Sequence, residues 1–415
     1  MRVLFLSHRF PYPPTFGSKV RSFNAIRHLA RDHEVSVHST VRSADEAAQS
    51  AGIAAFCTEY RAHRVHNLAQ VGKIAATLPT QISASEAFFH STSMQRAIDR
   101  ALARRSFDFV FAHCSAVGRY VEKVVGLPKL MDFCDVDSRK WHDYVAYKPW
   151  PLNLGYRWEA WRMAATERRV SQHFDRVTVA TPGEARTLEQ VGVRERVDWF
   201  PNGVDFDYFR PSTEAHDPDL ITFVGRMDYF PNEQGVADFC AQVWPRLRRE
   251  RPSLRLQIVG AEPTTRVQAL GRLAGVTVSG SVPDVRPYVQ RSALTVVPLT
   301  IARGTQNKIL ESMAMGVPVV SSAVAAGGVD AVAGEHLLAA GSPDQTLEMI
   351  LRVLGSPAER ARLAEAGLAR AQSHHSWTSA MQRMDTIIGQ CLKGSDGAAV
   401  APASGLRDSP PAVFE

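Results

Sequence analysis

Two stretches of the sequence repeat one pattern, in which an apolar strand is followed by a polar loop, a helical run and a second apolar strand. The first stretch places its strands at residues 3–7 and 35–38, and the second at residues 220–224 and 254–259. Within each stretch the two strands start about 32 to 34 residues apart, which is the length of one βαβ unit. These strands are apolar throughout, as a parallel sheet covered by helices on both faces requires. The chain is therefore predicted to form two similar doubly wound α/β domains.

The repeat divides the 415-residue chain into five parts. We predict an N-terminal Rossmann-like domain over residues 1–204, a polar linker over 205–219 and a C-terminal Rossmann-like domain over 220–375. A terminal helix over 376–393 follows Ser376, a good N-cap, and has the option of returning to the N-terminal domain. The Gly, Ala, Pro and Ser-rich tail over 394–415 has few large side chains to bury, so we expect it to be disordered.

Other segments fit the same alternation of strands and helices. Further strands are predicted at residues 109–113, 129–133, 177–181, 276–279, 294–298 and 317–321. Helices are predicted at residues 18–30, 84–104, 154–171, 235–249, 308–315 and 345–354, with a long pair after Pro357.

Composition narrows the functional classes. Apolar residues make up 45% and charged residues 22%, the mixture of an ordinary globular protein, and no window is apolar enough for a membrane span. The five cysteines form no CxxC pair, which argues against a disulfide framework or a zinc site and favours a reducing cytoplasm. The net charge of +6 suits a phosphate-bearing small ligand or an anionic lipid surface and is too weak to argue for nucleic acid.

The most informative segment is a strand, a polar loop and a short helix over residues 294–315. The loop Gly304, Thr305, Gln306 and Asn307 leads into the start of the helix, where unpaired N–H groups favour an anion. Lys308 stands in the first turn, where the helix dipole disfavours a cation unless an anion is bound. Glu311 lies one turn further and suits a ribose diol. An ordinary solvated Lys–Glu pair is the equally open alternative.

Four further residues are candidates, three at predicted strand ends, where open α/β sheets bind ligands, and one before the first helix. Gly225 and Arg226 follow the strand at 220–224, and Arg226 is a candidate to grip a diphosphate through two N–H groups. Gly17 precedes the first helix, and His113 ends the strand at 109–113. A solvated arginine and a structural histidine are the alternative interpretations. The chain has neither the P-loop spacing nor a GxGxxG, which weighs against a nucleoside triphosphatase or a dinucleotide oxidoreductase.

Residues 135–176 contain two patterns with possible functions, a short acidic motif and a basic stretch rich in tryptophan. Asp135 and Asp137 form a DxD, but so short a motif recurs by chance, and we predict no metal site. Residues 139–176 combine eight Lys or Arg with four Asp or Glu and include four of the seven tryptophans. This mixture suits the surface of an anionic bilayer. Aromatic residues packed in a domain core with the charges outside are the alternative.

Several motifs resemble the retaining nucleotide-sugar glycosyltransferases of family 4, which have the GT-B fold of two facing Rossmann-like domains with a cleft between them. The resemblance covers the chain to about Lys393, and a narrower likeness is to enzymes associated with bacterial exopolysaccharide and exosortase (PEP-CTERM) gene clusters. The matching segments are Asn202-Gly-Val-Asp205, Gly225-Arg226, residues 258–263 and 280–284, and Lys308-Ile-Leu-Glu-Ser-Met-Ala-Met-Gly-Val-Pro-Val-Val320, with residues 132–141, 223–232 and 305–308 for the narrower likeness.

The resemblance implies roles for individual residues. Glu311 would hold the ribose, Arg226 the diphosphate and the backbone near Val282 the base, while Gly17 and His113 would line the reaction centre. It implies no cofactor and no metal, because fixed cations stabilise the leaving diphosphate.

The chain departs from the family pattern at two positions. The first of two glutamates spaced eight apart is Arg303 here, and a lysine six residues after the arginine of the GR motif is Asn232. The first departure bears on recognition of the donor sugar, and the second removes a positive charge. We hypothesise that Lys308 restores this charge.

These observations predict a retaining, metal-independent glycosyltransferase that moves a sugar from a nucleoside diphosphate-sugar to a hydroxyl acceptor. His113, Arg226 and Lys308 are the predicted catalytic residues, and a lipid-linked oligosaccharide in exopolysaccharide synthesis is the favoured acceptor. The predicted location is the cytoplasm, with peripheral attachment to the inner face of the membrane through residues 139–176. A sugar-nucleotide epimerase of the same fold and a non-catalytic nucleotide-sugar-binding subunit are the alternatives.

Overall fold

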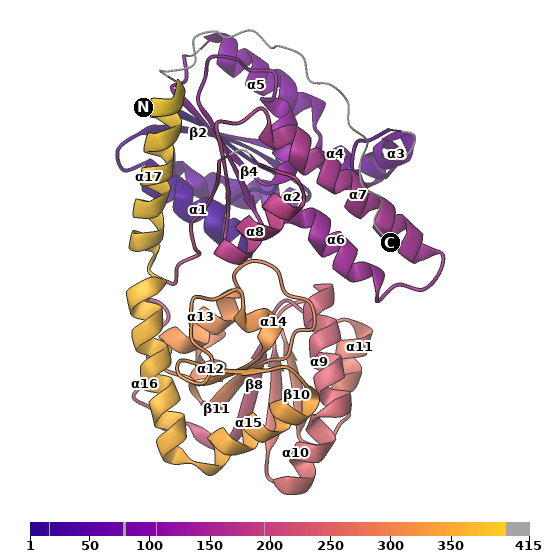
Figure 1. Ribbon diagram of the computed structural model, residues 1–415, viewed down its shortest axis with the longest axis vertical. Coiled ribbons are helices and arrows are strands. Elements are labelled where there is room, and N and C mark those ends of the chain that lie inside the picture. The colour runs from indigo at the N-terminus through magenta and orange to yellow at the C-terminus, as the bar shows by residue number, and fades with distance from the viewer. Residues whose placement is uncertain (16, 78–79, 105, 195, 396–415) are drawn as a thin grey trace.

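The computed structural model describes residues 1–15, 17–77, 80–104, 106–194 and 196–395 and has two α/β lobes, one above the other (Figure 1). The tail was predicted from residue 394, but residues 394 and 395 still belong to the last helix, and residues 396–415 lie outside the described part. No helix among the described residues is long and apolar enough to cross a membrane.

The N-terminal lobe is built on a seven-stranded parallel sheet with the order β3-β2-β1-β4-β5-β6-β7. Its strands are β1 (Arg2–Ser7), β2 (Glu34–Val41), β3 (Glu59–Arg64), β4 (Phe109–His113), β5 (Lys129–Cys134), β6 (Arg176–Val179) and β7 (Val197–Trp199). Its α-helices are α1 (Gly17–Leu29), α2 (Ala44–Gln49), α3 (Asn67–Thr77), α4 (Ala84–Phe89), α5 (Thr92–Arg104), α6 (Asp137–Val145), α7 (Leu152–Ser171) and α8 (Pro182–Gln190), with 3-10 turns η1 (Ser50–Phe56) and η2 (Ser115–Tyr120).

The C-terminal lobe has a six-stranded parallel sheet with the order β10-β9-β8-β11-β12-β13. Its strands are β8 (Asp217–Val224), β9 (Arg255–Val259), β10 (Val276–Gly280), β11 (Ser292–Val297), β12 (Val319–Ser322) and β13 (Leu338–Ala340). Its helices are α9 (Phe230–Gln242), α10 (Trp244–Glu250), α11 (Thr265–Leu270), α12 (Arg286–Gln290), α13 (Asn307–Ala314), α14 (Ala323–Ala326), α15 (Pro343–Gly355) and α16 (Pro357–His374), and α17 (Trp377–Ser395) follows.

Both sheets reverse their strand order beside the first strand of the lobe, so the predicted pair of doubly wound domains is confirmed. The central strands β4 and β11 are buried along their whole length. In the N-terminal lobe Phe5 packs into the cluster on one face of the sheet, whereas Leu4 and Leu6 pack into the cluster on the other. A strand with two buried faces has to be apolar at every position, which explains the continuous apolar runs.

The last helix, α17, packs on the N-terminal lobe although it follows the C-terminal lobe in sequence (Figure 1). Its side chains Met381, Met384 and Ile388 are buried in the same cluster as Phe5 and Phe111 of the N-terminal sheet. The helix starts as expected, with the Ser379 N–H donating to the Ser376 Oγ at 3.1 Å. The two lobes are therefore joined both by the linker and by this returning helix.

The structure corrects two predicted helices. Residues 84–104 form two helices because His90 adopts an extended conformation (φ −75°, ψ 123°) after α4. The run at 235–249 is also divided, into α9 and α10, which meet at Val243. In addition, β8 begins at Asp217, three residues before the predicted domain start at 220, because Asp217 and Asp219 pair with Arg255 and Arg251 of the neighbouring segment.

Candidate active site

The carboxyl ends of the two sheets face each other across the space between the lobes, and several contacts join them. Asn202 of the N-terminal lobe donates an amide N–H to the Asn307 Oδ1 at 3.0 Å. Gly304 of the C-terminal lobe packs so closely on Asp135 that a Cβ at this glycine would lie 1.8 Å from the Asp135 Oδ1. Gly304 also has a left-handed φ of 59°, which favours glycine. The predicted donor loop thus forms part of the contact between the lobes.

Lys308 in the first turn of α13 points toward the end of β8. Its Nζ donates to the Asn232 Oδ1 at 2.5 Å and lies 4.8 Å from the ring centre of Phe223. Gly225 makes room for this arrangement, because a Cβ there would lie 2.7 Å from the Asn232 Nδ2 and 3.1 Å from the Lys308 Nζ. The ammonium group of Lys308 therefore contacts the residue that replaces the family's lysine.

Glu311 lies one turn after Lys308 on α13, and both side chains are partly buried. Burial lowers the pKa of Lys308 to about 7, although Glu311 acts in the opposite direction. Burial likewise raises the pKa of Glu311 to about 7, against the effect of Lys308. These shifts favour a ligand site over an ordinary solvated pair. Shifts of this kind are typical of functional sites.

The rest of the donor loop contains an unsatisfied polar group. The Oγ1 of Thr305 is buried and has no hydrogen-bond partner among the described residues. Gln306 donates its side-chain amide to the Arg303 carbonyl at 3.0 Å, which closes the loop on itself. A buried hydroxyl without a partner costs free energy unless a ligand or water satisfies it.

Arg226 is engaged with a neighbouring carboxylate. Its Nε and Nη2 donate to the two oxygens of Asp228 at 2.6 and 3.0 Å, and this pairing raises the pKa of Arg226. A diphosphate at this position would compete with Asp228 for the guanidinium group.

His113 is held by a buried ion pair in the N-terminal lobe. Its Nδ1 lies 2.9 Å from the Asp132 Oδ2, and Arg21 binds both oxygens of Asp132 at 2.8 and 2.9 Å. Burial alone would raise the pKa of Asp132, but Arg21 and His113 hold it below its usual range. The carboxylate therefore stays ionised and fixes the orientation of the His113 ring at the end of β4.

Two other predicted residues lie at the borders of this site. Gly17 begins α1 opposite the C-terminal lobe, and a Cβ there would lie 3.9 Å from the Asn307 Nδ2. Val282 follows β10, the edge strand that lies two strands away from β8 in the sheet. The structure thus groups Gly225, Lys308 and Glu311 in one cluster and places Gly17 beside Asn307.

Two residues of this region were not predicted from the sequence. His8 directly follows β1. Its ring lies 6.4 Å from the ring of His113, centre to centre. The His8 Nδ1 is buried and has no hydrogen-bond partner among the described residues. Burial, with Arg9 and His113 nearby, lowers the pKa of His8 well below its usual value. Arg9 is the second residue: burial lowers its pKa, and Arg42 and Arg226 contribute. Their position directly after a strand is the sequence signal that could have identified them.

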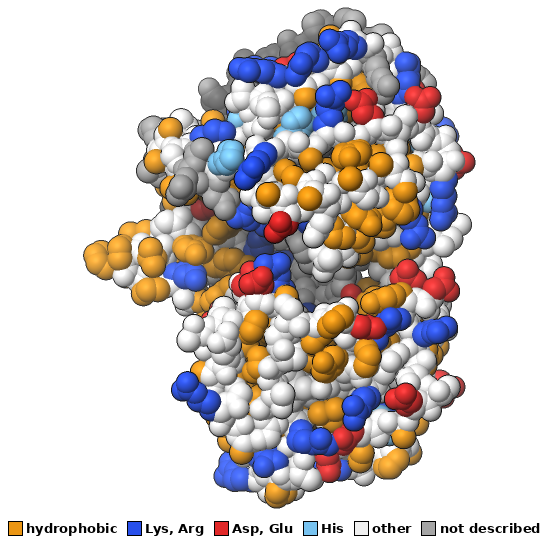
Figure 2. Space-filling view, turned by 180° about the vertical axis from the view of Figure 1, so that it is seen from behind, with side chains coloured by type: hydrophobic (Ala, Val, Ile, Leu, Met, Phe, Trp, Pro, Cys, Tyr) orange, Lys and Arg blue, Asp and Glu red, His pale blue; other side chains and the backbone are white. Residues whose placement is uncertain are grey.

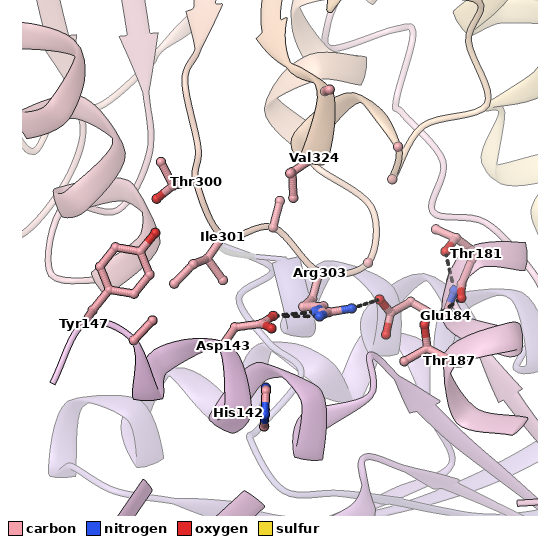
Figure 3. A pocket seen from close by; sticks show the side chains of 17 residues that line it. His142, Asp143, Tyr147, Thr181, Glu184, Thr187, Thr300, Ile301, Arg303 and Val324 are labelled. Atoms are coloured by element: carbon pink, nitrogen blue, oxygen red, sulfur yellow. Dashed lines mark hydrogen bonds and ion pairs between the residues drawn. The ribbon is translucent and has the colours of Figure 1, made fainter. Parts of the chain in front are cut away.

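Arg303 bridges the lobes rather than pointing into the donor loop (Figure 3). Its Nε and Nη2 bind the Asp143 Oδ2 at 2.8 and 2.7 Å, and its Nη1 lies 3.8 Å from the Glu184 Oε1. Both carboxylates belong to the N-terminal lobe.

The DxD residues have protein partners. Asp137 forms an ion pair with Lys140 and accepts a hydrogen bond from the Ser115 Oγ at 3.2 Å. Burial and the nearby Glu184 raise the pKa of Asp135 to about 6. Within the described ranges, no group of three or more His, Cys, Asp or Glu side chains could hold a metal ion.

Comparisons with known proteins agree with this architecture. Residues 16–203 match the family described as "Glycosyl transferase 4-like domain", and residues 218–356 match "Glycosyl transferases group 1". No curated protein sequence matches the chain. Each lobe therefore contains a glycosyltransferase domain, and the chain is a glycosyltransferase of the group 1 and 4-like type.

Solved structures show the same fold at low sequence identity. Sucrose-phosphate synthase of Thermosynechococcus elongatus superposes with a TM-score of 0.70 at 17% identity, over 95% of this chain and 100% of that one. Alr3699/HepE of Anabaena in complex with UDP-glucose gives 0.67 at 14% identity, over 94% and 100%. TarM gives 0.64 at 7% identity, over 93% and 98%. The predicted GT-B fold is therefore confirmed.

Proposed function

We propose that the chain transfers a sugar from a nucleoside diphosphate-sugar to a hydroxyl group of an acceptor, with retention of the anomeric configuration. The observation that carries this proposal is the cluster at the start of α13. There the partly buried ammonium group of Lys308 lies beside Gly225, and the unsatisfied Thr305 hydroxyl belongs to the loop that leads into the helix N-terminus. All three favour an anion with oxygen acceptors, which describes a diphosphate.

The chemistry follows from where negative charge develops. As the glycosidic bond to phosphate breaks, charge grows on the leaving diphosphate, and Lys308 and Arg226 would stabilise it together with the N–H groups of α13. Removal of one such donor costs about 10²- to 10³-fold in kcat. In this mechanism the fixed cations take the place of a divalent metal. His113, oriented by Asp132, would line the reaction centre from the opposite lobe.

The experiment that tests the donor is a thermal-shift panel of nucleoside diphosphates and their sugars. HepE was solved with UDP-glucose, which makes uridine nucleotides the first candidates. A ligand present at 100 times its Kd stabilises a protein by about 2.7 kcal/mol, so binding will be visible as a raised Tm. If no nucleotide raises the Tm, the proposal is wrong.

Product analysis then separates the two alternatives. Conversion of the donor sugar without an acceptor would indicate an epimerase, and donor binding without nucleotide release would indicate a binding subunit. A transferase releases nucleotide in proportion to the glycosylated product.

For the acceptor we propose a lipid-linked oligosaccharide of bacterial exopolysaccharide synthesis, reached by a cytoplasmic protein that attaches to the membrane surface. The support comes from α7, whose buried face contains charged side chains as well as Ala160, Met163 and Val170 and whose outer face carries tryptophans. It buries the charged Glu159, Arg162 and Glu167 and leaves Trp158 and Trp161 half-exposed, at 48% and 49%. Figure 2 shows apolar side chains on the projection formed by the α6 and α7 flank of the molecule.

The loop between α6 and α7 continues this apolar surface. Trp150 in this loop is 78% exposed, and Leu152 and Leu154 in the first turn of α7 are also exposed. Between Asp143 and Glu159 the chain has two cations and no acidic residue. Tryptophan and leucine beside a few cations are typical of segments that enter the interfacial region of a bilayer.

The structure changes the basis of the membrane prediction for residues 139–176. Much of the predicted excess of positive charge is used inside the protein, since Lys140 pairs with Asp137, and Arg169 pairs with Glu86 and Glu122. We therefore expect attachment to depend mainly on apolar insertion. The double variant Trp150→Ser/Trp161→Ser should lose sedimentation with anionic vesicles, whereas Val125→Ser, at a residue 94% exposed elsewhere, should retain it. Equal sedimentation of both variants would contradict the proposal.

A further inference from the structure

A small cavity lies inside the N-terminal lobe, between α5 and the strands β2 and β3. Its volume is about 180 Å³, and one of its lining residues is Phe107, which follows α5. The next residue, Asp108, donates its backbone N–H at 2.9 Å to the carbonyl of Arg2, the first residue of β1. The cavity therefore lies toward the amino ends of the strands, whereas the candidate active site is at their carboxyl ends.

The two strands line the cavity with polar side chains. Ser36 and His38 lie two positions apart on β2, and in the parallel register they stand opposite Glu59 and Arg61 of β3. Residues two apart point to the same face of a strand, which explains why all four meet at one cavity. Val37, between the first two, packs into the apolar cluster on the other face of the sheet.

The helix α5 covers these polar groups with small and basic residues. Ala97, Arg100, Ala101 and Arg104 line the cavity and follow the spacing i, i+3, i+4 and i+7, so they form one face of the helix. The two arginines stand four positions apart, where like charges repel each other. Neither of them forms an ion pair with a residue that the structure describes, and the Arg100 Nε donates to the Arg96 carbonyl at 3.0 Å.

His38 contributes a buried polar atom. Its side chain is 1% exposed, and its Nδ1 lies 3.3 Å from the His63 Nε2 in a stacked pair of rings. Its other nitrogen, Nε2, has no hydrogen-bond partner within the described part of the chain. Burial, with His63 and Arg61 nearby, lowers the pKa of His38 to about 4, so the ring is neutral near pH 7. If the His63 Nε2–H donates to His38, the hydrogen of the His38 ring is on Nε2, where a ligand can accept it.

We propose that this cavity is a second anion site, separate from the donor site, and that it binds the phosphate group of a small soluble ligand. Glu59 is paired with Arg61 at 2.9 Å, so the two arginines of α5 give the lining a net positive charge. Guanidinium groups bind phosphate oxygens through paired N–H donors. Two such groups and one imidazole can contact more oxygen atoms than the two of a carboxylate, which favours phosphate. The volume is below the roughly 300–1,000 Å³ of drug-sized sites, so the ligand is small.

The position of the site agrees with a ligand that arrives from solution. Arg100 and Arg104 are exposed, and α5 lies at the end of the N-terminal lobe that is farthest from the C-terminal lobe (Figure 1). Figure 2 shows Lys and Arg side chains gathered along this end of the lobe, and such a surface attracts anions. A phosphate in the cavity would link α5 to the edge strand β3, remote from the sugar-transfer chemistry.

The experiment removes the two charges of α5. Arg100→Gln/Arg104→Gln changes two exposed positions of a helix and leaves the strand residues of the cavity intact. Arg249→Gln/Arg272→Gln removes the same total charge at two exposed arginines of the C-terminal lobe that do not line the cavity, and it is the matched control.

Binding is followed on His38 by NMR of the full chain labelled with ¹³C at the histidine Cε1, and His38→Gln identifies its signal among the 14 histidines. The probes are inorganic phosphate, glycerol 3-phosphate, acetate and dihexanoyl phosphatidic acid, all at one ionic strength. We expect saturable shifts with the two soluble phosphates, a Kd at least fivefold higher in Arg100→Gln/Arg104→Gln, an unchanged Kd in the control and a weaker response to acetate. No shift with soluble phosphate, an equal response to acetate, a response to the lipid alone, or an equal Kd in both double variants would overturn the inference.

Thermal unfolding separates binding from a structural role of the arginines. With the donor site saturated by UDP, added phosphate should raise the Tm of the wild type and of the control but not that of Arg100→Gln/Arg104→Gln. Without phosphate this variant should be at least as stable as the wild type, because a repulsion is removed; a lower Tm would assign the arginines to the fold and contradict the inference. The Tm increase with UDP alone should be equal in all three proteins, so failure of the donor proposal is recognised separately.

Discussion

The pKa of Lys308 leads to a prediction about nucleotide affinity. Burial places this pKa at about 7, far below the 10.5 of a free lysine. Only the protonated form attracts a diphosphate, so affinity should be full below pH 7 and should fall as the pH rises above it. Deprotonation of the terminal phosphate occurs near pH 6 and is complete in this range.

The magnitude follows from one proton per binding event. If the bound diphosphate keeps Lys308 charged, each pH unit above 7 costs about 1.4 kcal/mol of binding free energy, a tenfold rise in Kd. From pH 7.5 to pH 9 we therefore expect about a 30-fold loss of affinity and uptake of about one proton. Glu311 raises the pKa of Lys308, so Glu311→Gln should move this loss toward lower pH.

Isothermal titration calorimetry with UDP, in two buffers of different ionisation enthalpy, measures both the Kd and the proton uptake. Lys308→Met should abolish the pH dependence together with most of the affinity, whereas Lys123→Met, at an exposed lysine, should retain both. A Kd that stays constant from pH 7.5 to pH 9, or a slope that survives in Lys308→Met, would refute the reasoning.

Three further predictions concern stability and closure. Asp132→Asn leaves the buried Arg21 guanidinium without its charge partner and should cost about 3–5 kcal/mol in urea unfolding; a loss below 1 kcal/mol would contradict the importance of the pair. Met384→Ala should lower the unfolding free energy by about 2–5 kcal/mol, measured on the N-terminal lobe by hydrogen exchange, and unchanged exchange there would show that α17 does not stabilise this lobe. Gly304→Ala places a methyl group against Asp135 and should separate the lobes, seen as a larger radius of gyration in X-ray scattering with the Tm nearly unchanged; an unchanged radius would show that the contact is not needed for closure.

The sequence predicted the strands that are buried on both faces and, in addition, the edge strand β10. The predicted run at 109–113 coincides with β4, because every position there is buried and therefore apolar. The strands that were missed, β3, β7 and β13, all lie at sheet edges, and β7 and β13 have only three residues each. In β3 most side chains are at least partly exposed and include Glu59 and Arg61, so no apolar run marks it. An edge strand is held in the sheet by backbone hydrogen bonds, which do not require apolar side chains, so its sequence need not show an apolar run.

The candidate site could be proposed from the sequence where the signal was local. Gly304 to Glu311 form one continuous loop–helix segment, and the proposed anion site there rests on their spacing. The partners of these residues could not, since Asn232 is 76 positions from Lys308 and Asp143 is 160 positions from Arg303. Such pairs depend on how the two lobes meet, and no pattern in either segment encodes the other.

The two departures from the family pattern argue against a non-catalytic subunit once their surroundings are considered. Asn232 removes one cation, but its amide oxygen accepts the ammonium group of Lys308, so a positive charge remains at that place. Arg303 reverses a charge, yet it contacts Asp143 and Glu184 of the opposite lobe, so carboxylates are still present beside the donor loop. In a site that had lost its function, the substituted residues would not need new partners. Here each change is matched by a group from another segment, which is expected if the site is still used with a different sugar.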